Sequence, residues 1–278
     1  MIDNRKIFDC IPFYQSNLLF ELRFKTLDKI VDKFVVCEAT KTHSGLKKEL
    51  NFDINKFSKL TNKIKYIVVD DMPDFLHNSN DKYPFYNFQI NKLHEGLSDA
   101  KDEDLIIVSD EDEIPNPNVI KKFNYTIFKY GIFLQNLYYY KFNIYNETEN
   151  NGNNWPGSRI CLRKNLKKFS DFRALKVKNK YSPFWKIWKE KSIDLINDGG
   201  WHFTYLMTYE KIAEKIKSSE HSEYNKHEFT DIEKIKYRVE NLIDPFDRKF
   251  NLRKIKIDDT FPDELFINQD KYKKWIIE

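Results

Sequence analysis

Short apolar runs alternate with amphipathic stretches through the first half of the chain. Runs of about five apolar residues are typical of buried strands, and they fall at Lys6–Phe13, Lys33–Ala39, Lys63–Asp71 and Asp104–Asp110. Between them, Asn17–Ile30 and Tyr83–Leu97 carry apolar residues at the spacing of a helix. This alternation predicts an α/β fold with a mostly parallel central sheet and helices on both faces.

Acidic side chains follow several of these predicted strands where the apolar run ends. Glu38 closes the second run, Asp70 and Asp71 close the third, and Asp110–Glu113 follow the fourth. In open parallel sheets, ligands bind beyond the carboxyl ends of the strands. The sequence therefore marks this edge of the sheet as a candidate binding site.

The second half of the chain has a less regular pattern. Gly131–Tyr145 is strand-like and aromatic, whereas Asn146–Ser158 is polar and Asn-rich and predicts a mobile loop. Gly199–Leu206 is a compact run that begins with two glycines, and Thr208–His221 predicts an amphipathic helix. From Asp244 onward, prolines and aromatics indicate irregular wrapping. No internal repeat and no domain boundary stand out.

Composition and charge narrow the class of protein. Of 278 residues, 41% are apolar and 32% are charged, which is typical of a soluble globular protein. The net charge of +4 is too mild to indicate nucleic-acid binding, but it is compatible with weak attraction to an anionic membrane surface. No run approaches the ~20 apolar residues of a membrane-spanning helix, and the polar first residues do not resemble a signal peptide. The three cysteines form no CxxC pair, so we expect no zinc site, no redox motif and a reducing, cytoplasmic compartment.

Four consecutive acids, Asp110 to Glu113, need an explanation because like charges at this density repel one another. A helix N-terminus does not account for them, since the expected cap is Asn116, with Pro117 in the first helical position. An EF-hand is excluded because Lys121 stands where the bidentate glutamate belongs. A solvated surface loop stays open as an alternative, although the acids follow directly on a buried strand.

A divalent cation offers a chemical reason for the acids. In an extended segment, residues i and i+2 share a face, so we expect Asp110 and Asp112 to point together and Glu111 to point away. Oxygen ligands favour Mg²⁺ or Mn²⁺, and an added imidazole tilts the choice toward Mn²⁺. Such ions are usually held by one or two carboxylates plus substrate phosphates, which indicates a nucleoside diphosphate ligand.

Three segments, taken in order, resemble glycosyltransferase family 17. They are Ile7–Gly45 with "FVVCE", Ile106–Pro117 with "DEDEIP" and Gly199–Leu206 with "GWH". The resemblance extends over roughly residues 7–242. It implies a GT-A fold, the class of many nucleotide-sugar transferases, as one catalytic domain over residues 1–278. Residues up to about 125 would bind the nucleotide sugar, and residues from about 126 would form the acceptor-side half with a C-terminal wrapping segment.

The resemblance also implies roles for individual residues. Asp110 and Asp112 would hold the metal on the donor's diphosphate, and His202 would be a further ligand of the metal or the diphosphate. The donor would be a UDP-sugar, with GlcNAc as the transferred sugar, and the acceptor would be a glycan. The remaining donor contacts would be Glu38 at the uridine, and Gln89 and Asn91 at the ribose or diphosphate.

Each of these residues also has a structural interpretation. The alternative for Glu38 is to cap the end of a strand, and for Gln89 and Asn91 the role of ordinary polar residues of a helix is slightly favoured. A single histidine is usually structural, but the position of His202 between a glycine pair and an aromatic-rich strand favours a role in the site. Trp201 beside it is as suited to the core as to stacking on a sugar.

Transfer with inversion requires a further carboxylate that deprotonates the acceptor hydroxyl as it attacks. Asp198, just before "GGWH", is the preferred candidate, and Glu223, in "EHSEY", is the second. Asp171 and Glu210 stay open as alternatives.

Two other classes of function remain. A metal-dependent phosphohydrolase or nuclease would need a second acidic cluster for a paired metal, and Asp70 and Asp71 are the obvious supply. A non-catalytic sugar-binding relative would keep the fold without turnover. The Asn-rich loop with Trp155 is a candidate lid or acceptor contact. The chain shows none of the membrane anchor and lumenal stem of the family's animal enzymes, which leaves acceptor and compartment open.

Overall fold

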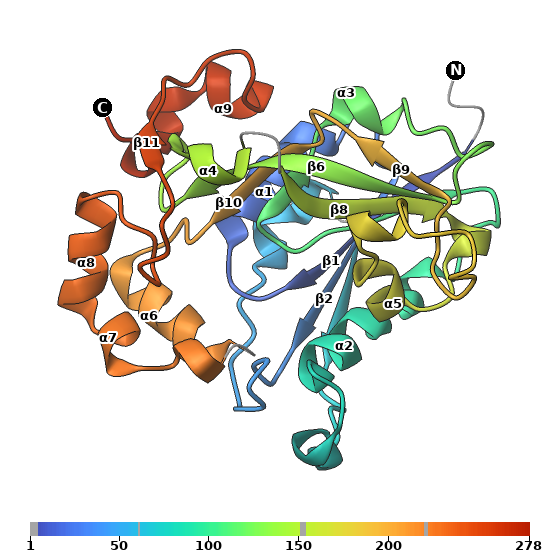
Figure 1. Ribbon diagram of the computed structural model, residues 1–278, viewed down its shortest axis with the longest axis horizontal. Coiled ribbons are helices and arrows are strands. Elements are labelled where there is room, and N and C mark those ends of the chain that lie inside the picture. Colours follow the sequence, from blue (N-terminus) through green and yellow to red (C-terminus); the bar gives the residue numbers. More distant parts are fainter. Residues whose placement is uncertain (1–4, 61, 151–153, 220–221) are drawn as a thin grey trace.

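The computed structural model describes residues 5–60, 62–150, 154–219 and 222–278. Their strands join in a sheet with the order β11-β7-β6-β8-β4-β1-β2-β3, and β5, β9 and β10 pair beside this path (Figure 1). The strands are β1 Ile7–Phe13, β2 Lys33–Ala39, β3 Ile64–Val69, β4 Leu105–Val108, β5 Glu113–Pro115, β6 Tyr130–Tyr139, β7 Ile144–Asn146, β8 Trp155–Leu162, β9 Ile193–Ile196, β10 Gly200–Thr204 and β11 Leu252–Lys254.

Helices cover the sheet and close its ends. The α-helices are α1 Asn17–Leu27, α2 Pro84–Asn91, α3 Pro117–Ile120, α4 Glu147–Asn150, α5 Phe169–Arg173, α6 Tyr209–Ser218, α7 His227–Thr230, α8 Ile232–Glu240 and α9 Asp263–Ile267. Helices α6, α7 and α8 form a group beside the last strands (Figure 1). Short 3₁₀ turns lie at Ile54–Leu60, Asp74–Asn78, Lys92–Leu97, Arg163–Asn165, Val177–Asn179, Ser222–Tyr224 and Gln269–Trp275.

The direction of the strands divides the sheet into two halves. Strands β3, β2, β1 and β4 run parallel, as the apolar runs predicted. The other half is mixed, because β8 lies antiparallel between β4 and β6, while β9 and β10 run parallel to β6. The α/β class is confirmed, with the parallel order concentrated in the half that ends in the acidic segment.

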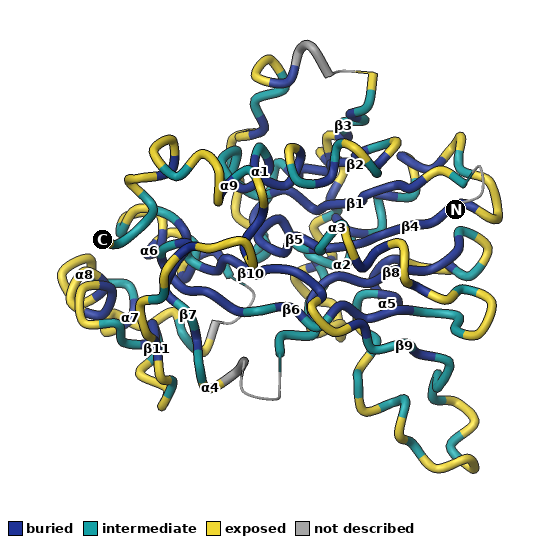
Figure 2. The backbone as a smooth tube through the Cα atoms, turned by 90° about the horizontal axis from the view of Figure 1, so that it is seen from above, coloured by how far each residue is buried: buried dark blue, intermediate teal, exposed yellow. Residues whose placement is uncertain are grey.

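Two apolar layers pack against the parallel strands, one on each face of the sheet. Successive residues of β1 alternate between them, so that Ile7 and Ile11 pack with α1 while Phe8 and Cys10 pack with α2. Figure 2 shows the strands as a continuous buried centre beneath exposed loops. All three cysteines are free and buried in this core, where they act as small apolar residues.

Helix α1 begins as the sequence predicts. The side chain of Ser16 accepts a hydrogen bond from the backbone N–H of Leu19, which satisfies one of the unpaired donors of the first turn. The helix ends at Leu27, three residues before the predicted boundary.

The predicted mobile loop Asn146–Ser158 is only partly correct. Glu147–Asn150 form α4, and β8 already begins at Trp155, where it pairs with β6. The centre of that loop, 151–153, lies outside the described residues. The Asn-rich composition concealed the start of the strand.

No helix in the described part of the chain combines the length and the apolar character that crossing a membrane requires.

Candidate active site

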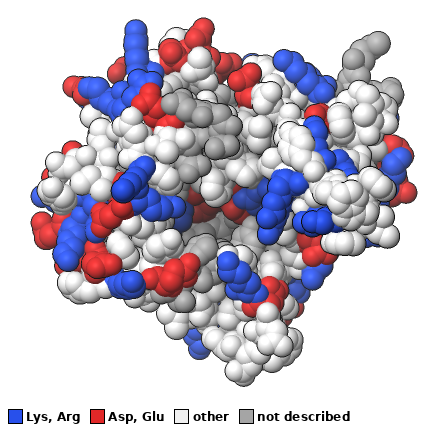
Figure 3. All heavy atoms as spheres, in the orientation of Figure 1, with Lys and Arg blue, Asp and Glu red and all other residues white. Residues whose placement is uncertain are grey.

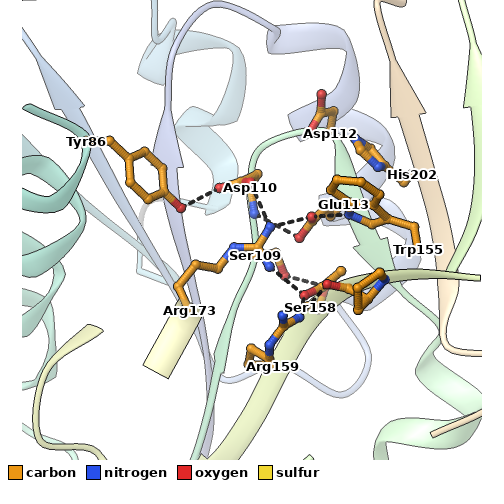
Figure 4. A network of polar contacts seen from close by, with 12 residues as sticks. Tyr86, Ser109, Asp110, Asp112, Glu113, Trp155, Ser158, Arg159, Arg173 and His202 are labelled. Carbon is orange, nitrogen blue, oxygen red and sulfur yellow. Dashed lines mark hydrogen bonds and ion pairs between the residues drawn. The ribbon is translucent and has the colours of Figure 1, made fainter. Parts of the chain in front are cut away.

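The four acids form a tight turn instead of the extended segment that the sequence suggested. The backbone N–H of Glu113 bonds to the carbonyl of Asp110 at 3.1 Å, directly after β4 and at the start of β5. The prediction of an extended segment is therefore wrong, and Asp110 and Asp112 each have their own protein partners (Figure 4). We call residues 110–113 the acid turn.

A buried ion pair supports the acid turn from behind. The guanidinium of Arg23, on α1, donates to both oxygens of Asp9 at 2.6 Å, and neither side chain is exposed. The same guanidinium donates to the hydroxyl of Ser109 at 2.8 Å and to the backbone carbonyl of Glu113. One arginine therefore links β1, the end of β4 and the acid turn.

Glu111 points away from the other acids, as the sequence predicts. One of its oxygens accepts hydrogen bonds from the backbone N–H groups of Tyr14, Gln15 and Ser16, at 2.9, 3.0 and 3.2 Å. Burial raises the pKa of this carboxyl, although the backbone donors oppose the shift. Glu111 joins the acid turn to the segment between β1 and α1.

Asp110 lies at the open side of the turn, with its side chain 35% exposed. It accepts hydrogen bonds from the hydroxyl of Tyr86 at 2.8 Å and from Arg173 at 2.7 Å. Burial alone would raise the pKa of this carboxyl, but the Arg173 guanidinium outweighs burial and holds the pKa below its ordinary value. Asp110 is therefore an anion at neutral pH that still faces solvent.

Glu113 is a supporting residue. Its fully buried carboxylate accepts hydrogen bonds from Arg173 at 2.5 Å and from the indole N–H of Trp155 at 2.7 Å. Arg173 thus bridges Asp110 and Glu113, as Figure 4 shows. The contact with Glu113 also makes Trp155 part of the wall of the site.

Asp112 meets a lysine and the predicted histidine. Lys215, on α6, lies 3.0 Å from one carboxylate oxygen, and Nε2 of His202, on β10, lies 3.4 Å from the other. Burial opposes ionisation, but Lys215 and His202 together hold the pKa of Asp112 far below its ordinary value. The imidazole packs against Trp155 with ring centroids 4.9 Å apart, and its Nδ1 is buried without a partner among the described residues.

The glycine pair before His202 allows β10 to approach the acid turn. Gly200 has a φ of +122°, which is strained for any residue with a side chain. A Cβ there would lie 2.1 Å from the carbonyl oxygen of Ile114. The close pairing of β10 with β5 places His202 opposite Glu113.

A pocket of about 300 Å³ opens beside His202. Trp155, Lys215 and Glu223 line it together with His202, and aromatic rings and an arginine complete the wall, at Tyr139, Tyr205, Tyr224, Phe246 and Arg248. Figure 3 shows a hollow in the middle of one face, with acidic atoms at its floor and basic atoms around its edge. Aromatic walls with a few charged groups suit a sugar or a nucleotide.

The carboxylate of Glu38 is hydrogen-bonded within the protein through both of its oxygens. Its buried carboxylate accepts hydrogen bonds from Lys48 at 2.6 Å, from the backbone N–H of Asn51 at 2.7 Å and of Phe52 at 3.0 Å, and from the hydroxyl of Tyr66 at 2.9 Å. Four donors satisfy both oxygens. This arrangement favours the strand-end interpretation over the predicted contact with uridine.

The side chains of Gln89 and Asn91 also form hydrogen bonds within the protein. The amide of Gln89 donates to the carbonyls of Phe13 and Cys37, at 3.1 and 3.0 Å, and so joins the ends of β1 and β2. Asn91 exchanges two hydrogen bonds with Ser170 on α5. These bonds favour structural roles for both residues over the predicted contacts with the donor.

Asp198 faces a different hollow from His202. It lies in the turn before β10, with a φ of +51°, and it lines a second hollow together with Asn116 and Trp201. Glu223 lines the pocket of His202. We therefore reverse the order of preference for the catalytic base.

Two basic residues of the site escaped the sequence analysis. Arg173 ends a short helix, and Lys215 is one lysine among several on an amphipathic helix. Nothing local distinguishes them from solvated surface charges. Only the packing of α5 and α6 against the acid turn reveals their role.

Asp112 and His202 suit a divalent ion whose other coordination positions are filled by a substrate. Among the described residues, no group of three or more His, Cys, Asp or Glu side chains could hold a metal alone. Asp112 and His202, however, present an oxygen and a nitrogen 3.4 Å apart, and adjacent ligands of an octahedral ion lie roughly 3 Å apart. Two protein ligands are sufficient where phosphate oxygens fill other positions.

Comparisons with known proteins give a match at the level of the family. The profile of glycosyltransferase family 17 matches residues 1–250. Among curated proteins, no match was found. A crystal structure of 4-diphosphocytidyl-2C-methyl-D-erythritol synthase matches with 12% identity and a TM-score of 0.37, over 69% of this chain and 90% of that one. The glycosyltransferase GlyE of Streptococcus pneumoniae TIGR4 matches with 9% identity and a TM-score of 0.35, over 70% of this chain and 46% of that one. Both superpositions are too loose to bear on function.

Proposed function

The chain belongs to glycosyltransferase family 17, and on this premise we propose that it is a metal-dependent, inverting enzyme that uses a UDP-sugar. It transfers the sugar, GlcNAc, to a hydroxyl of a glycan acceptor and forms a β-linkage. That the protein is a glycosyltransferase follows from the family. The metal, the donor and the sugar are the proposal.

The acid turn is the observation that carries the proposal. Asp110 and Asp112 lie at the carboxyl end of a parallel strand, where ligands of such sheets bind. Both carboxylates are kept ionised by basic neighbours, Arg173 and Lys215. Asp112 and His202 would hold Mn²⁺ or Mg²⁺, with Asp110 as the second carboxylate of the turn. When bound, the ion supplies positive charge to the diphosphate leaving group.

Lys215 also has a role at the diphosphate. Its ammonium bonds to Asp112 at 3.0 Å, and it lines the pocket with His202. A lysine beside a carboxylate can turn to a phosphate oxygen when the carboxylate engages a cation. Lys215 would then bind the diphosphate and stabilise the charge that develops as it leaves.

Glu223 is the proposed general base. Inversion requires that the base lie on the face of the sugar opposite the leaving group, so the base should not belong to the acid turn. Glu223 lines the pocket on the side of the 3₁₀ turn Ser222–Tyr224, apart from Asp110 and Asp112. It would accept the proton of the acceptor hydroxyl as that oxygen bonds to the anomeric carbon.

The proposed organisation is one catalytic domain with two halves. Residues up to about 125 would bind the donor, and residues from about 126 would form the acceptor-side half with a C-terminal wrapping segment. Free, buried cysteines support a reducing compartment, and we propose the cytoplasm.

The acids at the end of β3 argue against a phosphohydrolase. Two-metal enzymes hold their ions roughly 4 Å apart. Asp70 and Asp71 follow β3, which is three strands away from β4 in the sheet, a separation of roughly 14 Å. Asp71 also pairs with Lys92. This spacing gives no support to a second metal beside the acid turn.

A screen of nucleotide sugars for metal-dependent release of the nucleotide tests the proposal. We expect UDP release from UDP-GlcNAc with Mn²⁺, and its loss with EDTA and in Asp112→Asn. Asp270→Asn removes an exposed carboxylate elsewhere and serves as the matched control. The proposal fails if no UDP-sugar is turned over, or if Asp112→Asn is as active as the control. Sugar binding without turnover on any acceptor would favour a non-catalytic relative.

A further inference from the structure

A group of large apolar side chains is largely exposed to solvent between α5 and β9. Five such residues fall within eight positions, with exposed fractions of 71% for Tyr181, 84% for Phe184, 62% for Trp185, 85% for Ile187 and 73% for Trp188. Clustered exposure of this kind marks an interaction surface, whereas single exposed apolar residues are ordinary. We call residues 176–191 the aromatic-lysine loop.

The loop has an ordered backbone of its own. The N–H of Lys186 bonds to the carbonyl of Pro183, and the N–H of Lys189 to the carbonyl of Lys186, both at 3.1 Å. The ammonium of Lys191 binds two carbonyls of the same turns, at Phe184 and Lys186. Figure 2 shows the segment before β9 projecting from the body of the molecule. The turns thus present the aromatics outward on a protruding feature.

The aromatic-lysine loop carries a strong excess of positive charge. Residues 176–191 contain six lysines and one glutamate, a net charge of +5. The whole chain carries +4, which leaves −1 for all the rest. The single glutamate, Glu190, is paired with Lys129 outside the loop. The basic excess of this protein is therefore concentrated on the segment that also exposes its aromatics.

We propose that the aromatic-lysine loop docks the enzyme on an anionic phospholipid bilayer. Tryptophan and phenylalanine settle at the boundary between lipid headgroups and acyl chains, where their rings leave water. Lysines beside them are attracted by the negative surface potential, and neither signal alone gives firm binding. Charge complementarity favours this occupant over a second copy of the chain, because two loops of net charge +5 repel each other.

Docking is independent of the proposed donor chemistry. The loop contains no residue of the acid turn or of the pocket beside His202. Variants of the loop should leave UDP binding unchanged, and failure of the UDP proposal would leave docking intact. The two proposals can therefore fail separately.

Vesicle co-sedimentation tests the docking. We compare vesicles of phosphatidylcholine with about 30% phosphatidylglycerol, which supplies a negative surface potential, with vesicles of phosphatidylcholine alone. Trp185→Ser/Trp188→Ser removes two anchors, and Tyr237→Ser/Ile267→Ser removes two equally exposed apolar residues elsewhere. Lys186→Glu/Lys189→Glu reverses charge in the loop, and Lys234→Glu/Lys236→Glu makes the same change on α8.

We expect binding to the anionic vesicles only, weakened by salt and reduced about tenfold or more by either loop variant. Both control variants should bind like the unchanged protein, and circular dichroism should show that every variant is folded. The proposal is overturned if the unchanged protein ignores anionic vesicles, or if loop and control variants lose binding equally. It is also overturned if the loop variants only convert a dimer into a monomer in sedimentation velocity.

Discussion

Replacement of Arg23 by methionine should be one of the most damaging single changes in the chain. The side chains of Arg23 and Asp9 are both completely buried, and two bonds of 2.6 Å join them. Removal of the arginine leaves Asp9 as an uncompensated charge in the core, while methionine fills much of the same volume. The carbonyl of Glu113 and the hydroxyl of Ser109 lose a donor at the same time.

The size of the effect follows from these contacts. Breaking a buried ion pair costs about 3–5 kcal/mol, out of a total stability of about 5–15 kcal/mol for a typical protein. Replacing both partners with apolar residues removes the buried charge, so Asp9→Leu/Arg23→Met should cost less than either single change suggests. We expect about 1–2 kcal/mol for the double variant, from the two acceptors left without Arg23.

Urea denaturation of the unchanged protein, both single variants and the double variant measures this coupling. With a slope of ~3 kcal/mol per molar urea for a chain of this size, Arg23→Met should lower the midpoint by about 1 M or more. The reasoning is refuted if Arg23→Met costs less than about 1 kcal/mol, or if the double variant costs the sum of the two single ones.

Three further changes test other parts of the structure. Gly200→Ala should destabilise the protein by about 2 kcal/mol or more, because its φ of +122° and the 2.1 Å approach of a Cβ to Ile114 leave no room; a melting temperature close to that of the unchanged protein would contradict this. The pKa of Glu264 lies below its ordinary value. Burial alone would raise this pKa, but the hydrogen bonds from Lys25 and other donors outweigh burial. Its stabilising contribution is therefore present above the unfolded pKa of ~4.3 and is lost as pH falls through the lower folded pKa. Glu264→Gln should cost stability at pH 7 and progressively less below pH ~4, whereas a deficit independent of pH in urea titrations would count against the ion pair. Lys215→Met should weaken UDP binding about tenfold or more by calorimetry while the fold is kept, and unchanged affinity would remove Lys215 from the diphosphate site.

The parallel half of the fold could be predicted from the sequence because its signals are local. Apolar runs bounded by polar residues define β1 to β4, and α1 begins at Asn17, where the helical spacing begins. The mixed half was not predicted, because the antiparallel insertion of β8 depends on pairing with strands distant in sequence. The Asn-rich sequence before Trp155 is typical of a loop, although strand β8 begins at Trp155.

The candidate site could be located but not assembled from the sequence. The acids after β4 identified the place, and "GWH" identified the second contributor, His202. Residues 110–113 form a turn closed by a hydrogen bond between residues 110 and 113, where the sequence predicted an extended segment, and Asp110 and Asp112 have different protein partners. The basic partners, Arg173 and Lys215, reach the turn through tertiary packing that leaves no local signal.

Calorimetric titration with UDP, with and without Mn²⁺, tests the central claim most directly. The unchanged protein and Asp270→Asn should bind UDP, and affinity should fall about tenfold or more without the ion, because the diphosphate completes its ligand set. Asp112→Asn should lose this dependence on Mn²⁺. Absence of UDP binding to the unchanged protein, or equal Mn²⁺-dependent binding by Asp112→Asn, would contradict the account of the acid turn as the donor site.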